Sequence, residues 1–157
     1  MRITASLLLF TALTTLAQTR DYPKLPPDNP IHVTDTRRAR ELDRAAAPYI
    51  AKARRSYPAA KRRFLAGLPP KYLFSLTIKL WDRSHTRFEV VFVEVDKISD
   101  GKVFGRVASQ ISLPVGHKFG DRIVFAEREI MDWTIVHPDG TEEGNIVGKF
   151  MESHQRR

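Results

Sequence analysis

Between Thr34 or Asp35 and Gly67, hydrophobic residues recur at intervals of three and four. They form one stripe of helical period: Leu42, Ala46, Tyr49, Ile50, Ala53, Tyr57, Ala60 and Phe64. Pro48 and Pro58 interrupt this stripe. Because proline lacks the amide hydrogen that a helix interior needs, we expect two or three short helices here.

The hydrophobic period changes to two after Pro70. Residues 72–81 alternate between apolar and polar side chains, which predicts a half-buried strand. Further strands are predicted at residues 88–98, 102–111, 122–130 and 133–137, and a weaker edge strand at 142–151. We therefore expect an α+β fold, in which short N-terminal helices pack on a curved antiparallel sheet of five to six strands.

Three local signals refine the predicted sheet. Asp100-Gly101 indicates a tight hairpin, because both positions tolerate the positive φ of a type I′ turn. Gly105 predicts a bulge or a close approach of another backbone. Pro138-Asp139-Gly140 predicts a second turn. Trp81 and Trp133 are expected in the core, because tryptophan buries a large apolar area.

The first residues are typical of an export signal. Residues 1–17 combine a charged start, an apolar run and a small residue at the expected cleavage point, Ala17. We expect a proline-rich linker at 18–33, a single domain at 34–151 and a flexible tail at 152–157. This organisation predicts a periplasmic or secreted protein with no transmembrane segment after cleavage; an uncleaved anchor is the alternative.

Cysteine is absent from the whole chain. Disulfides, thiolate zinc sites and cysteine nucleophiles are therefore excluded. Serine and glycine occur in no nucleophile-elbow, phosphate-loop or dinucleotide-binding motif. The histidines have no ligand spacing, and a metal site formed by His85, His117 and His137 is the remaining alternative to none. We expect no cofactor.

Positive charge is concentrated in the helical part. Residues 18–71 carry 13 Lys and Arg against 5 Asp and Glu, whereas residues 72–157 carry 12 against 13. The candidate binding residues are Arg54, Arg55, Lys61, Arg62 and Arg63, within a wider set that adds Arg37, Arg38, Arg40, Arg44 and Lys52. Such a surface suits an anionic envelope component or an acidic protein. Nucleic acid is not the expected partner of an exported chain, and a simple solvated helix face is the alternative.

Three carboxylates are the candidates for catalysis. Glu127 and Glu129 alternate on a predicted strand and would project from one face, and Asp132 follows beside Trp133. Two carboxylates are the minimum apparatus of a glycoside hydrolase, and an exported enzyme would meet the cell wall. The alternative is a solvated face with cross-strand charge pairs to Arg106, Arg122 and Arg128.

Several of these elements together resemble the YegJ-like bacterial family, a domain of unknown function. The residues that carry the resemblance are Glu89, Phe104-Gly105, Leu113-Pro114, Phe119-Gly120-Asp121, Ile130, Asp132-Trp133, Gly140 and Gly144. The resemblance covers about residues 45–151. It implies a compact helix-plus-sheet domain and no particular activity. From the residues themselves, we expect a non-catalytic binding or interaction module, with a cell-wall-active hydrolase as the alternative.

Overall fold

A computed structural model describes residues 32–33, 36–113 and 115–155. The expected signal at 1–17 and nearly all of the expected linker at 18–33 lie outside these residues. The elements in chain order are β1 (His32–Val33), α1 (Thr36–Ala66), β2 (Leu73–Trp81), β3 (Phe88–Ser99), β4 (Lys102–Val107), β5 (Arg122–Ala126), the 3-10 turn η1 (Glu127–Glu129), β6 (Asp132–Val136), β7 (Glu142–Gly144) and α2 (Ile146–Gln155).

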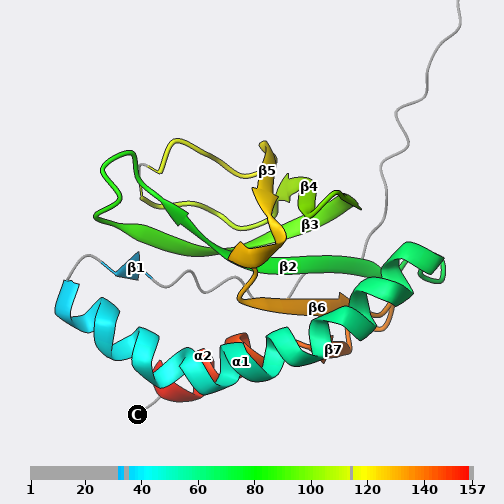
Figure 1. Cartoon of the computed structure of the whole chain (residues 1–157), viewed down its shortest axis with the longest axis horizontal. Helices are drawn as coiled ribbons and strands as arrows, with labels where there is room; N and C mark the ends of the chain where they lie inside the picture. Colours follow the sequence, from blue (N-terminus) through cyan, green and yellow to red (C-terminus); the bar gives the residue numbers. More distant parts are fainter. Residues whose placement is uncertain (1–31, 34–35, 114, 156–157) are drawn as a thin grey trace, which may run out of the picture.

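The strands form one antiparallel sheet in the order β5-β4-β3-β2-β6-β7, and the short β1 pairs with the start of β3. Figure 1 shows α1 crossing beneath β6 and β7, with α2 beside it. β4 and β5 form the opposite end of the same sheet. The predicted α+β class, with helix packed on an open antiparallel sheet, is confirmed. No helix in the described ranges is long and apolar enough to cross a bilayer.

The helical region is one continuous helix of 31 residues, so the prediction of two or three short helices is wrong. Pro48 and Pro58 both lie on the exposed side of α1. There, the carbonyl groups that lose their helical partner can be hydrated by water, which lowers the cost of each proline. The opposite side is held by packing, and Figure 1 shows α1 bowed around the sheet.

A row of buried alanines seven residues apart holds α1 in place. Ala46 and Ala53 pack against Met131 and against Val147 of α2, while Ala60 joins the main core of the sheet. Alanine at these positions lets the helix approach its neighbours closely. The main core itself is built from alternate strand positions: Leu76, Ile78, Val91, Val93, Val103, Ile123 and Trp133.

The predicted turn signals are confirmed. Asp100 and Gly101 have φ values of 54° and 70° between β3 and β4. The Gly140 amide donates to the His137 carbonyl at 2.9 Å, which closes the second turn. A Cβ at Gly105 would overlap the Glu94 carbonyl oxygen, so this glycine marks a close backbone approach, beside a register shift in β3.

Several predicted strands end early. The strand predicted at 102–111 stops at Val107, as β4. The strand predicted at 122–130 stops at Ala126, as β5, after which the chain turns through η1. The predicted edge strand at 142–151 is wrong beyond Gly144, because residues 146–155 form α2. Residues 152–155, expected in a tail, are part of this helix. Its start is held by Asp132 of β6, a partner that local sequence does not reveal.

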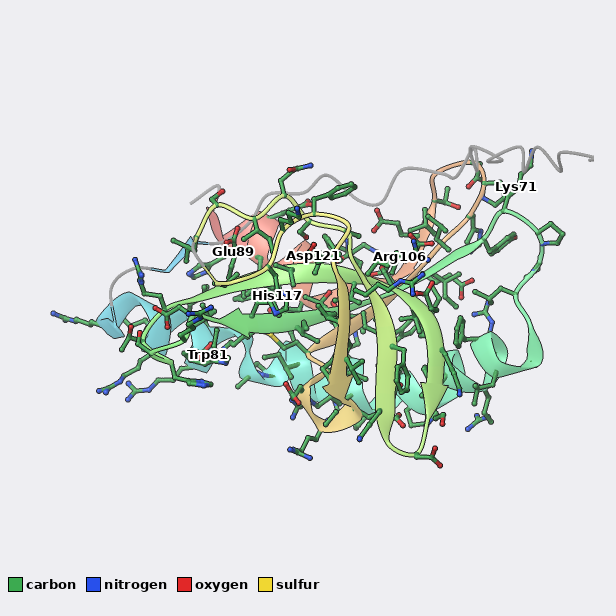
Figure 2. The ribbon with its side chains drawn as sticks, turned by 90° about the horizontal axis from the view of Figure 1, so that it is seen from above. Lys71, Trp81, Glu89, Arg106, His117 and Asp121 are labelled. Carbon is green, nitrogen blue, oxygen red and sulfur yellow. The ribbon has the colours of Figure 1, made fainter. Side chains whose placement is uncertain are left out.

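The two tryptophans differ in burial. Trp133 is buried, as predicted, and its indole N–H donates to the Ser56 hydroxyl at 2.9 Å. Trp81 is 41% exposed, so its predicted place in the core is wrong. It ends β2, where it contacts the rings of Phe88 and His85. Figure 2 shows Trp81 and Lys71 at opposite ends of that strand.

Candidate functional site

The candidate carboxylates Glu127 and Glu129 lie in η1 and not on a strand, so the predicted alternation along one face is wrong. Glu127 accepts hydrogen bonds from Lys61 Nζ at 2.7 and 2.8 Å and from the Tyr57 hydroxyl at 3.0 Å. Burial, together with the bond to Glu127, raises the pKa of the Tyr57 hydroxyl. Glu127 is therefore the acceptor that ties α1 to the end of β5.

Glu129 closes the same turn. Its Oε1 accepts the Ala126 amide at 3.0 Å, and the Ile130 amide donates to the Glu127 carbonyl at 3.3 Å. The carboxylate thus satisfies a backbone donor at the point where the strand ends. This role explains an acidic residue here without reference to chemistry on a substrate.

Asp132 is fully buried and caps α2. Its Oδ1 accepts the amide of Trp133 at 2.8 Å, and its Oδ2 accepts the amide of Val147 in the first turn of α2. Burial raises the pKa of this carboxyl to about 6, while the amide donors and the charge of Lys149 act in the opposite direction. A carboxylate at a helix N-terminus accepts hydrogen bonds from amides that have no partner within the helix, and its negative charge interacts favourably with the helix dipole.

The three candidates therefore serve different contacts. Glu127 faces α1, Glu129 faces its own turn and Asp132 holds α2. A hydrolase needs two carboxyl groups that flank the substrate, and Asp132 has no exposed surface through which a substrate could reach it. The geometry gives all three structural partners.

The candidate basic residues divide into two groups. Arg54 donates from Nε to the Ile130 carbonyl at 2.7 Å and from Nη2 to the Arg128 carbonyl at 3.2 Å. Lys61 pairs with Glu127. Arg63 donates both terminal nitrogens to Glu143, at 2.5 and 2.8 Å. These three side chains hold α1 against η1 and β7.

The second group faces solvent. Arg40, Arg44, Arg55 and Arg62 are exposed on α1, and none pairs with an acidic side chain in the part of the chain that the structure describes. At 100° per residue these four positions fall on one side of the helix, together with the exposed prolines. We call this set the outer arginine row. Of the five predicted binding residues, only Arg55 and Arg62 belong to it.

A second charged cluster was not predicted. Glu143 receives Arg63 on both oxygens and also contacts His137 Nε2 at 2.8 Å. The Arg63 guanidinium, with a smaller contribution from His137, lowers the pKa of Glu143 to about 2, although partial burial acts against it. The His137 ring lies 4.7 Å from that of Tyr72. The cluster joins the end of α1 to the β6–β7 hairpin.

Glu89 is a further buried carboxylate. It lies in β3 and accepts the amides of Ser112 and Leu113 at 2.9 to 3.1 Å. Figure 2 shows Glu89 under the long loop between β4 and β5, which also carries His117. An acidic residue inside an apolar strand was the only signal in the sequence, and its partners come from 23 and 24 positions away.

The histidines are spread over the molecule. His85 lies in the β2–β3 turn, His117 in the β4–β5 loop and His137 at the end of β6. Over residues 32–33, 36–113 and 115–155, no three metal-ligating side chains come together. The histidine alternative for a metal site therefore gains no support from their placement.

No protein-family model, no curated protein and no solved structure matches the chain. The resemblance to the YegJ-like family therefore stays a prediction. Any functional inference for this chain rests on its own residues.

Proposed function

We propose that this chain is an exported, non-catalytic binding module that uses the outer arginine row to bind a phosphate-bearing anionic surface of the cell envelope. The observation that carries the proposal is four exposed guanidinium groups on one side of α1 without acidic partners among the described residues. Nearby like charges repel, so a row of arginines without acidic partners stabilises the protein less than a row of alternating acidic and basic residues would. Such a row instead favours association with anions.

The length of the row suits an extended partner. Arg40 and Arg62 are 22 residues apart, which corresponds to about 33 Å along a helix at about 1.5 Å per residue. A guanidinium binds phosphate with two parallel hydrogen bonds, and it gives up its hydration more readily than an ammonium group does. A surface with repeating phosphates can therefore engage several of these residues at once.

The side chains between the arginines are small. Ala47, Pro48, Ala51, Pro58 and Ala59 are exposed around them. A tight protein interface usually has a central aromatic or aliphatic anchor, and a helix that inserts into lipid needs a broad apolar face. Between Arg40 and Arg62, this side of α1 offers neither, and the exposed Leu65 lies beyond the last arginine, near the end of the helix. It fits contact with the headgroups of anionic lipids better than contact with an acidic protein.

The internal bonds of α1 keep the row in position. Arg54, Lys61 and Arg63 attach the helix on both flanks of the row to η1 and β7. The exposed arginines therefore sit on a fixed platform and lose little backbone entropy when they bind.

Vesicle binding tests the proposal. The protein should bind vesicles that contain phosphatidylglycerol and not vesicles of phosphatidylcholine alone, and the affinity should fall steeply as salt is raised. The variant R44E/R55E/R62E should lose this binding. The matched control R83E/K102E/K118E changes the net charge equally at exposed residues elsewhere and should keep most of it.

Binding that does not depend on salt, or an equal loss in the two triple variants, would refute the proposal. Circular dichroism and thermal unfolding of both variants must show a native fold. If neither kind of vesicle binds, and the arginine variant alone loses an acidic protein from an envelope extract, the partner is that protein instead.

A further inference from the structure

A groove of about 350 Å³ lies between the two helices. Its lining includes Tyr49 and Lys52 from α1 and Ile146, Lys149, Phe150 and Ser153 from α2. We call it the interhelix groove. Its volume is at the lower end of the range for sites that bind small molecules, about 300 to 1,000 Å³.

Each helix contributes one lysine and one aromatic ring. The rings of Tyr49 and Phe150 are stacked, with centroids 4.2 Å apart and an angle of 19° between their planes. Lys52 and Lys149 bring the charge, and no acidic side chain among the described residues lines the groove. The site therefore combines positive charge with an apolar surface, which is the pattern that an amphiphilic anion requires.

The walls of the groove are held from below. Ala46 and Ala53 of α1 pack against Val147 and Met151 of α2. Lys149 Nζ donates one hydrogen bond to the Gly144 carbonyl at 3.1 Å, which orients the ammonium group and leaves it further donors. The groove is thus present before any ligand arrives, which reduces the entropy lost on binding.

The groove opens beside the outer arginine row. Lys52 lies three residues before Arg55, and residues at this spacing are neighbours on a helix surface. A membrane that contacts the row would therefore present its headgroups to the groove. This neighbourhood connects the two sites and indicates what the groove would meet.

We propose that the interhelix groove binds the headgroup of a single anionic phospholipid. In this arrangement, the phosphate lies between Lys52 and Lys149, and the glycerol ester segment covers the Tyr49 and Phe150 rings. The inference rests on the proposed function, since the lipid surface supplies the ligand. Free phosphate shares the charged part of this chemistry but has no apolar part to contact the rings.

The test uses phosphatidylglycerol with short acyl chains, kept below its critical micelle concentration. Titration into the full protein, followed by NMR shifts of the α2 amides or by calorimetry, should show saturable binding. Lys52→Gln and Lys149→Gln should each weaken it about tenfold, the loss expected for one charge-assisted hydrogen bond. Inorganic phosphate should bind far more weakly than the lipid.

The matched control separates the two proposals. R40E/R44E/R62E removes three members of the outer arginine row and leaves Arg55, the neighbour of Lys52, unchanged. It should keep its affinity for the short-chain lipid within about threefold, because its three side chains do not line the groove and lie at least eight residues from Lys52. Tyr49→Ala should weaken lipid binding without changing the response to inorganic phosphate.

Two results would overturn the inference. One is saturable vesicle binding without any binding of the short-chain lipid, which leaves the proposed function intact and removes the groove. The other is equal affinity for inorganic phosphate and lipid, which reduces the site to a simple anion contact. Salt-independent vesicle binding would instead refute the proposed function.

Discussion

The carboxylate of Asp132, in β6, accepts a hydrogen bond from the backbone amide of Val147, in the first turn of α2. The two residues are 15 positions apart in the chain and are separated by the β6–β7 hairpin. Asp132 is fully buried, so the contact is shielded from water. A single side chain thus joins the end of the sheet to the second helix.

Asp132 should make stability depend on pH. Its pKa rises from 3.8 to about 6 on folding, so the folded state binds the proton more tightly than the unfolded state does. The resulting stability is fully present below pH 4 and is lost as pH rises through about 6. A difference of about two pKa units corresponds to about 3 kcal/mol.

Urea unfolding of the protein and of Asp132→Asn between pH 4 and 7 measures this effect. Asparagine does not titrate, so the difference in unfolding free energy between the two proteins should change across that range. The variant should also lose about 1–3 kcal/mol at low pH, because only the side-chain oxygen of asparagine accepts hydrogen bonds and its NH2 group leaves one of the two backbone amides without an acceptor. A difference that is constant with pH would contradict the assignment.

Glu143 should contribute in the opposite sense. Its pKa is lowered from 4.5 to about 2, mainly by Arg63, so its stability is present above pH 4.5 and is lost as pH falls through about 2. Because the pair is partly exposed, we expect Glu143→Gln to cost only about 1 kcal/mol at pH 7. The cost, measured by urea unfolding, should shrink near pH 2 and in high salt.

Gly144 should not tolerate a side chain. It has a φ of 76°, and a Cβ there would overlap the Trp133 carbonyl oxygen and approach its ring. Gly140 has a similar φ of 84° but nothing within 4 Å of the added atom. Gly140→Ala should cost about 1–2 kcal/mol from backbone strain alone. Gly144→Ala should cost clearly more in thermal or urea unfolding, and equal costs would show that the overlap is relieved.

Pro58 should lower the stability of α1. It lies inside the helix and on its exposed side. Pro58→Ala restores one amide donor and should raise the free energy of unfolding by about 1–2 kcal/mol, part of the usual cost of an interior proline. Pro138→Ala, in the β6–β7 turn, is the control and should give no gain. An unchanged stability for Pro58→Ala would mean that the bend is favoured by packing.

A substitution of Glu127 distinguishes the proposed binding function from the alternative of a hydrolase. Glu127→Gln weakens the contacts to Lys61 and Tyr57 and should cost about 1–2 kcal/mol of stability. It should leave vesicle binding unchanged, since its carboxylate is not part of the outer arginine row. Release of soluble fragments from purified cell wall by the unmodified protein, lost in Glu127→Gln, would support the hydrolase instead.

The strands were predictable because their signals are local. The alternation in β2 and the Asp100-Gly101 turn depend on neighbours in the chain. The predicted half-burial of that strand is wrong, because Ser75 and Thr77 on its polar face are buried as well. The continuity of α1 was not predictable from local sequence. The free-energy cost of Pro48 and Pro58 in a helix depends on whether they face water, and tertiary packing decides this. The start of α2 was hidden for a similar reason, since its cap comes from Asp132 in another element.

The same reasoning applies to the candidate site. The sequence placed ten basic residues on the helical segment but could not divide them into paired and free groups. Arg54 finds its carbonyl partner 76 positions away, and Arg63 finds Glu143 at 80. A helical wheel does place Arg40, Arg44, Arg55 and Arg62 on one side. Only the tertiary structure shows that the basic residues on either side of this row, such as Arg54 and Arg63, are paired with η1 and β7.

The Asp132 cap also has a kinetic consequence. A helix of ten residues that contains Gly148 has little stability in isolation, because forming its first turn loses more conformational entropy than the first hydrogen bond offsets. Its amides find their acceptor only after the β6–β7 hairpin has brought Asp132 next to Val147. We therefore expect folding to complete the hairpin before α2, and native-state hydrogen exchange should show α2 opening before the strands of the sheet. The sheet acts as the template on which α2 is assembled.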